Sequence, residues 1–127
     1  MQKFNPDTIA PPIGAYTQAI LLPPNARVLQ ISGQVGIDPA GVVPEGVTAQ
    51  AEAIFDNIEA ILAAADMGPG DLIKLTAYLV EPADLPAYGA VRAARLGDLR
   101  PCSTLVFVKA LVRPELVVEV EAIAARA

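Results

Sequence analysis

Hydrophobic and polar positions in the last quarter of the chain predict two β-strands joined by a turn. Residues 104–111 are almost continuously apolar, as is typical of a strand covered on both faces. Residues 116–124 alternate instead, with valine and alanine on one face and glutamate on the other. Residues 112–115 include a proline, which cannot continue a ladder, and are predicted to form the turn. Glu119, a carboxylate flanked by valines, is therefore expected either on a solvated face or in a cleft.

Two further strands are predicted in the first third of the chain. Residues 15–22 and 27–35 both alternate, and the Pro-Pro-Asn-Ala between them is typical of a turn, so they are expected to form a hairpin. Residues 1–14 are rich in proline and are predicted to be irregular. The second strand ends in the small and polar residues Ser32 and Gly33, which indicate either a bulge or a place where another group approaches the backbone closely.

Helical spacing of apolar residues predicts two helices. The first occupies residues 47–65 and is stopped by the Gly-Pro-Gly segment that follows. Residues 72–80 alternate strictly and predict a strand with one polar or interfacial face. The second helix begins after Asp84 and ends at Gly97. Arg92 and Arg95 lie three positions apart on this helix, which favours a shared, solvated face.

The predicted order is strand, strand, helix, strand, helix, strand, strand (ββαβαββ) in a single domain of residues 1–127. The economical architecture is an α/β (α+β) fold with a mixed sheet and both helices on one face. The other face is expected to meet a neighbouring subunit, with polar clefts at the boundary. The polar residues expected on that face are Lys74, Thr76, Tyr78, Glu119 and Glu121.

Composition narrows the chemistry that the chain can perform. There is no histidine and only one cysteine, Cys102, which excludes Ser-His-Asp and Cys-His nucleophile systems and the usual zinc sites. No phosphate loop or dinucleotide-binding motif is present, so no cofactor and no metal are expected. Catalysis would have to use carboxylate, hydroxyl, phenol, backbone amide and water.

Charge and hydropathy limit the binding partners and the cellular compartment that can be expected. The net charge is −5, and the nine basic residues are scattered rather than aligned, which argues against a nucleic-acid partner. No apolar run is long enough for a transmembrane helix, and the first residues lack a signal-peptide core, so no membrane partner is expected. A single cysteine fits a reducing, cytoplasmic environment.

Four motifs occur in order over nearly the whole chain: IGAYTQA at 13–19, ISGQ at 31–34, the segment from Gln50 through Asn57-Ile58 to Leu62, and VEVEAIA at 118–124. With their spacing, they resemble the Rid family, also called YjgF or L-PSP endoribonuclease-like proteins. The resemblance implies a chorismate-mutase-like fold and a homotrimer with a small-molecule ligand in the clefts between subunits. It also implies hydrolysis of reactive enamines and imines to 2-oxo acids and ammonia.

The resemblance implies cleft positions for Tyr16, Ser32, Gly33 and Glu119. Glu119 and Tyr16 are the candidate catalytic residues, because a carboxylate helped by a phenol can orient or deprotonate water. Backbone amides near Ser32 and Gly33, or near Ser103 and Thr104, are candidates for binding the substrate and holding developing charge.

Two positions depart from the pattern of imine-hydrolysing members, which carry an arginine in a Pro-Ala-Arg-Ser motif. Here that stretch is Pro-Cys-Ser-Thr, and Ser103, followed by Thr104, stands where the arginine would bind the substrate carboxylate. Serine cannot replace two charge-assisted hydrogen bonds, so a neutral or cationic substrate is expected, unless Arg100 reaches in by another route. Gly89, also expected in the cleft, stands where many members have asparagine.

Three functions follow from these residues. The first is a deaminase-like hydrolase of altered specificity, and the second is a non-catalytic, metabolite-binding or chaperone-like trimer. The third is RNA cleavage, suggested by the older family name. The acidic charge balance, the absent histidine and the lack of an aromatic platform argue against it.

Overall fold

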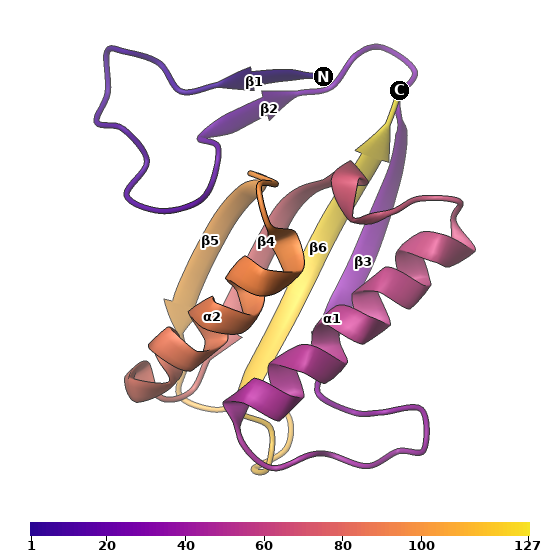
Figure 1. Cartoon of the computed structure of the whole chain (residues 1–127), viewed down its shortest axis with the longest axis vertical. Coiled ribbons are helices and arrows are strands. Elements are labelled where there is room, and N and C mark those ends of the chain that lie inside the picture. The colour runs from indigo at the N-terminus through magenta and orange to yellow at the C-terminus, as the bar shows by residue number, and fades with distance from the viewer.

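A four-stranded sheet with two helices packed on one face makes up most of the computed structural model, which describes residues 1–127 (Figure 1). The strands are β1 (Gln2–Phe4), β2 (Ala19–Leu21), β3 (Arg27–Val35), β4 (Leu72–Leu79), β5 (Cys102–Phe107) and β6 (Val118–Arg126). The helices are α1 (Val47–Ala64) and α2 (Leu85–Leu96), and short 3-10 turns precede β4 and α2 at Pro69–Asp71 and Pro82–Asp84. The mixed sheet with both helices on one face is therefore confirmed.

The main sheet has the strand order β3-β6-β4-β5. β6 runs antiparallel to β3 and β4, whereas β4 and β5 are parallel. Side chains alternate along β6 as expected, so that Val118, Val120 and Ala122 are buried under the helices. Glu119 points to the other face, opposite Val35 of β3 and Tyr78 of β4.

The aliphatic core lies between the helices and the sheet. The α1 stripe of Ile54, Phe55, Ile58 and Leu62 is buried against it, and each such side chain contributes about 1.5–3 kcal/mol to stability. Gln50 lies in the same helix and is only 1% exposed. Its side-chain amide donates to the carbonyl oxygens of Pro44 (3.0 Å) and Glu115 (2.8 Å) and accepts from the Val117 N–H (2.9 Å). Gln50 thereby holds the loop that leads into β6.

The N-terminal region differs from the prediction. β2 covers only Ala19–Leu21 and pairs with β1, so the expected hairpin with β3 was wrong and the strand order begins with an unpredicted strand. The residues before β2 are held by the segment just before β5: the Thr17 N–H donates to the Pro101 carbonyl (3.2 Å) and the Thr17 hydroxyl to the Arg100 carbonyl (2.6 Å). Residues 15–18, included in the predicted strand, lie outside any strand.

β5 was expected to be covered on both faces, and within one chain it is not. It is the edge strand of the sheet, and Val106 and Phe107 remain 41% and 46% exposed. Residues 108–111, included in the predicted strand, lie beyond its end. Figure 1 shows that both helices cover the same face, which leaves the opposite face of the sheet bare. Neither helix combines the length and the apolar character that a membrane span requires.

Candidate functional site

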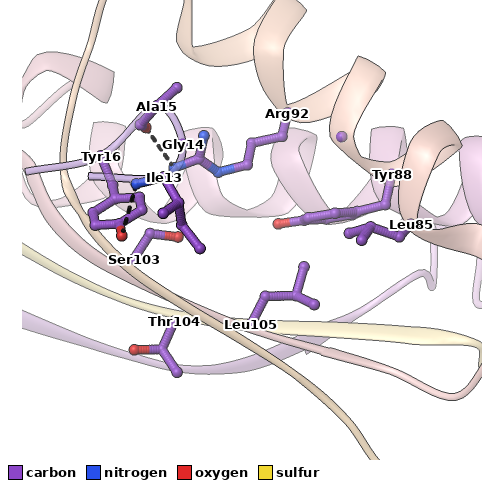
Figure 2. Close-up of a pocket in the computed structure, with 11 residues that line it drawn as sticks. Ile13, Gly14, Ala15, Tyr16, Leu85, Tyr88, Arg92, Ser103, Thr104 and Leu105 are labelled. Atoms are coloured by element: carbon purple, nitrogen blue, oxygen red, sulfur yellow. Dashed lines mark hydrogen bonds between the residues drawn. The ribbon is translucent and has the colours of Figure 1, made fainter. Parts of the chain in front are cut away.

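A cavity of about 540 Å³ lies between the N-terminal segment, α2 and the edge strand β5 (Figure 2). We call it the α2 pocket. Its lining consists of residues 13–16, residues 103–105 and the α2 residues Leu85, Tyr88, Gly89 and Arg92. None of these side chains is acidic, so Arg92 is the only charged group in the wall.

The N-terminal wall of the α2 pocket is held by hydrogen bonds. A guanidinium nitrogen of Arg92 donates to the Ala15 carbonyl (3.2 Å), as drawn in Figure 2. The Ile13 N–H donates to the hydroxyl oxygen of Tyr16 (3.3 Å). The Tyr16 hydroxyl therefore accepts one hydrogen bond from its own segment and retains its proton for donation.

The α2 wall contains a buried tyrosine with an unpartnered hydroxyl. Tyr88 is 1% exposed, and its hydroxyl oxygen has no hydrogen-bond partner. Burial raises the pKa of Tyr88 to about 12, so the phenol is neutral near pH 7. Gly89 opens onto empty space, because a Cβ atom at that position would meet nothing within 4 Å. The wall thus combines a buried donor with room for ligand.

The β5 wall presents only some of the side chains expected there. Ser103 and Leu105 pair with Leu75 and Ala77 of β4, which face the helices, so their side chains point toward the α2 pocket. Thr104 points to the opposite face, where its hydroxyl accepts a hydrogen bond from Lys74 Nζ (2.8 Å). Thr104 therefore borders the α2 pocket without pointing its side chain into it.

Arg100 does not reach the α2 pocket. Its guanidinium donates to the carbonyl oxygens of Gly97 and Leu99, both at 2.9 Å, at the C-terminal end of α2. This position satisfies carbonyls that a helix end leaves without partners. In this structure Arg100 therefore does not supply a positive charge to the pocket in place of Ser103.

Glu119 lies in a second, shallower cavity of about 350 Å³ on the bare face of the sheet. Tyr78, Glu121 and part of the loop that follows β5 also line this glutamate pocket. The Tyr78 hydroxyl donates to Glu121, and this hydrogen bond, with burial and the charges of both glutamates, raises the pKa of Tyr78. Glu119 itself makes no side-chain hydrogen bond or ion pair within the chain.

The Glu119 carboxylate lies close to Gly33 of β3. β3 changes register between Ile31 and Gln34, so Ser32 and Gly33 form a bulge. A Cβ atom at Gly33 would lie 2.0 Å from Glu119 Oε2 and 2.9 Å from its Cδ. Both interpretations of this glycine therefore apply: Gly33 is a bulge residue, and its lack of a side chain lets the Glu119 carboxylate approach the backbone.

Within one chain, the predicted site residues fall into two groups. Tyr16, Gly89, Ser103 and Thr104 line the α2 pocket, whereas Glu119 lines the glutamate pocket, where its carboxylate lies against the bulge formed by Ser32 and Gly33. The candidate pair Tyr16 and Glu119 does not share a cavity in the single chain.

Sequence reasoning missed Arg92 and Tyr88. The interpretation of Arg92 and Arg95 as a shared solvated face was wrong, because Arg95 binds Glu52, Asp56 and Glu59 at 2.8–3.0 Å while Arg92 enters the α2 pocket. The one signal in the sequence was that Tyr88 and Arg92 are four positions apart, which makes them neighbours on one face of a helix.

The fold and the sequence can be compared with known proteins. Residues 8–126 match the family described as Endoribonuclease L-PSP. A RutC family protein of Pyrococcus horikoshii is 37% identical over 115 residues, which cover 89% of this chain and 88% of the relative. The 2-iminobutanoate/2-iminopropanoate deaminase of Escherichia coli is 33% identical over 118 residues, which cover 90% of this chain and 89% of that enzyme.

Solved structures show the same fold. A Rid family protein of unknown function from Yersinia pestis, YyfB, is similar with a TM-score of 0.85 and 29% identity, over 98% of both chains. RidA from an Antarctic Psychrobacter species is similar with a TM-score of 0.74 and 34% identity, again over 98% of both chains. From its sequence match and its fold, the chain belongs to the Rid (YjgF, endoribonuclease L-PSP) family.

Proposed function

We propose that this protein is a Rid-type hydrolase that converts a small imine into a carbonyl compound and ammonia in clefts between copies of the chain. The observation that carries the proposal is the division of the site into two complementary halves. One half, the α2 pocket, offers a cation, hydroxyl groups and no carboxylate, and the other offers an unpaired carboxylate beside a bulge. The 33% identity to a 2-iminobutanoate/2-iminopropanoate deaminase supports the same reaction.

The proposed assembly is a homotrimer in which the α2 pocket of one copy faces the glutamate pocket of the next. The bare sheet face and the open edge of β5 support an interface there, because they leave Val28, Val106 and Phe107 exposed. A closed ring of three copies would cover these surfaces and would form three equivalent clefts.

In the proposed mechanism, Glu119 accepts a proton from water as the water oxygen attacks the imine carbon. Glu119 passes this proton to the nitrogen, which gives a neutral carbinolamine. It then moves the hydroxyl proton of the carbinolamine to the same nitrogen, and ammonia leaves as the C=O bond forms. One water is consumed and one ammonia released for each C=N bond. The Tyr16 hydroxyl of the facing copy donates a hydrogen bond during the proton transfers, and backbone amides near Gly33 or Ser103 stabilise the developing charge.

We also propose that Ser103 stands at the position of the arginine with which imine-hydrolysing relatives bind the substrate carboxylate. The specificity is then altered, because the binding group at this position is a neutral hydroxyl. The open space at Gly89 adds room for a larger substrate side chain.

The test is ammonia release from 2-iminobutanoate generated enzymatically in the assay. Glu119→Gln is expected to lower kcat by about 100-fold or more, as is typical of the loss of a general base. Glu121→Gln is the matched control, because it removes a carboxylate from the same strand that is already bound by Tyr78. A wild-type rate no better than buffer, beside an active positive control, rejects this substrate class. Equal effects of the two variants reject the role of Glu119.

One observation favours a non-catalytic trimer as the second candidate: within the α2 pocket, no side chain can act as a general base near pH 7. The bound ligand would then be held without turnover. Thermal-shift measurements separate the candidates, because a ligand that stabilises the protein and remains unconsumed supports binding alone.

A further inference from the structure

Arg92 reaches across the α2 pocket from α2 to the N-terminal segment (Figure 2). Its one hydrogen bond, to the Ala15 carbonyl, occupies a single N–H of a group that carries several donors. It forms no ion pair with any carboxylate of the chain. The guanidinium therefore faces the cavity with most of its donors unused.

The Arg92 guanidinium is partly desolvated and has no anionic partner, which is energetically unfavourable. Burial lowers the pKa of Arg92, and the positive charge of Arg100 acts in the same direction, although the guanidinium remains charged at neutral pH. The chain as a whole carries a net charge of −5, so a positive pocket is a local exception. A partly desolvated cation without a carboxylate partner favours an anionic ligand.

Tyr88 provides a second and independent indication of a ligand. Its hydroxyl is buried, has no partner and points into the α2 pocket from the same helix as Arg92. A neutral phenol can donate a hydrogen bond, and a buried donor without an acceptor destabilises the free protein. Beside these two groups, Ile13, Leu85 and Leu105 provide apolar walls.

We propose that Arg92 and Tyr88 bind the carboxylate of a small monocarboxylate whose aliphatic part lies against Ile13, Leu85 and Leu105. A carboxylate can accept from the guanidinium and from the phenol at the same time, and the remaining volume suits a short chain. The inference rests on the proposed function only where it identifies this carboxylate as that of the imino acid. If the ligand is the imino acid, Arg92 of α2 supplies the positive charge that is missing at Ser103. The protein then accepts an anionic substrate, in contrast to the neutral or cationic substrate expected from Ser103 alone.

The test measures the binding of 2-oxobutanoate, its neutral analogue 2-oxobutanamide and inorganic phosphate to the full-length protein by calorimetry. Wild type is expected to bind the carboxylate at least about 10-fold more tightly than the amide. Arg92→Gln should weaken 2-oxobutanoate binding by about 10- to 100-fold and leave the amide unchanged. Arg92→Lys keeps the charge but not the planar fork, so its affinity for 2-oxobutanoate should lie between those of wild type and Arg92→Gln.

Two further variants separate ligand binding from support of the fold. Tyr88→Phe should weaken 2-oxobutanoate binding by about 5-fold without lowering the melting temperature, because it removes a hydroxyl that has no partner in the free protein. Arg100→Gln removes the same charge outside the pocket and should leave the affinity within about 2-fold of wild type.

Several outcomes overturn the inference. Equal wild-type affinity for 2-oxobutanoate and its amide is one, and preference for phosphate is another. Equal loss of both organic ligands in Arg92→Gln would assign Arg92 to the pocket wall through Ala15 instead. Failure of the proposed hydrolase function would give a different result: the protein would still prefer the carboxylate ligand but would release no ammonia. Ammonia release with an unchanged KM in Arg92→Gln would keep the hydrolase and reject the carboxylate site.

Discussion

Replacing Gly33 with alanine is predicted to disable the Glu119 carboxylate without unfolding the sheet. The new Cβ would lie 2.0 Å from Glu119 Oε2, whereas ordinary contact begins at 3.4 Å, so the oxygen must move by about 1.4 Å. A misplacement of this size costs about 100-fold in rate, or about 2.7 kcal/mol in the activation barrier. The displaced group is the end of a flexible side chain, and alanine suits a strand better than glycine, so the free energy of unfolding should change by less than about 1 kcal/mol.

The assay combines steady-state ammonia release with urea unfolding of Gly33→Ala, Glu119→Gln and the double variant. If alanine acts only through the carboxylate, the double variant should be no slower than Glu119→Gln alone. Gly36→Ala is the structural contrast, because its Cβ would lie 2.7 Å from the Cα of Gln50 and would push on the helix backbone. A wild-type rate in Gly33→Ala, or additive losses in the double variant, would refute the reasoning.

Three other substitutions test the structure more widely. Gln50→Leu removes three hydrogen bonds and leaves the Val117 N–H without a partner, so urea unfolding should show a loss of about 3 kcal/mol. Gly89→Ala adds a methyl group in open space within a helix and should raise stability by about 0.5–1 kcal/mol, measured in the same way. Hydrogen bonding from Arg126 lowers the pKa of Asp71 in the folded protein. This contribution is fully present above the unfolded pKa of about 3.9 and is lost as the pH falls through the folded pKa, so melting curves of wild type and Asp71→Asn should converge at acidic pH.

The parts of the fold that could be predicted are those in which one element buries one face. The limits of β3 agree with the predicted strand, and α1 begins at the predicted Val47. The alternation along β6 correctly separated the buried valines from Glu119. In each case the apolar period reports directly on burial against the core, which is a local property of the chain.

Pairing partners and side-chain destinations are not local properties. β2 pairs with β1, and Thr17 just before β2 is held by carbonyls more than eighty positions later; no local pattern indicates either contact. The positions of Arg92 and Arg95 diverge for a similar reason. α1 supplies three carboxylates to Arg95, whereas Arg92 faces the cavity beside β5. This difference follows from how α2 packs between α1 and β5.

The central place of β6 has a consequence for the order in which the molecule can form. During synthesis, β3 emerges from the ribosome more than eighty residues before the strand that it pairs with, and β4 can meanwhile join only β5. Until residues 118–126 arrive, the aliphatic stripe of α1 has half a sheet to pack on, and strand edges remain open to other nascent chains. The strand that carries Glu119 is thus also the one that closes the sheet, and the carboxylate is positioned only when folding is complete.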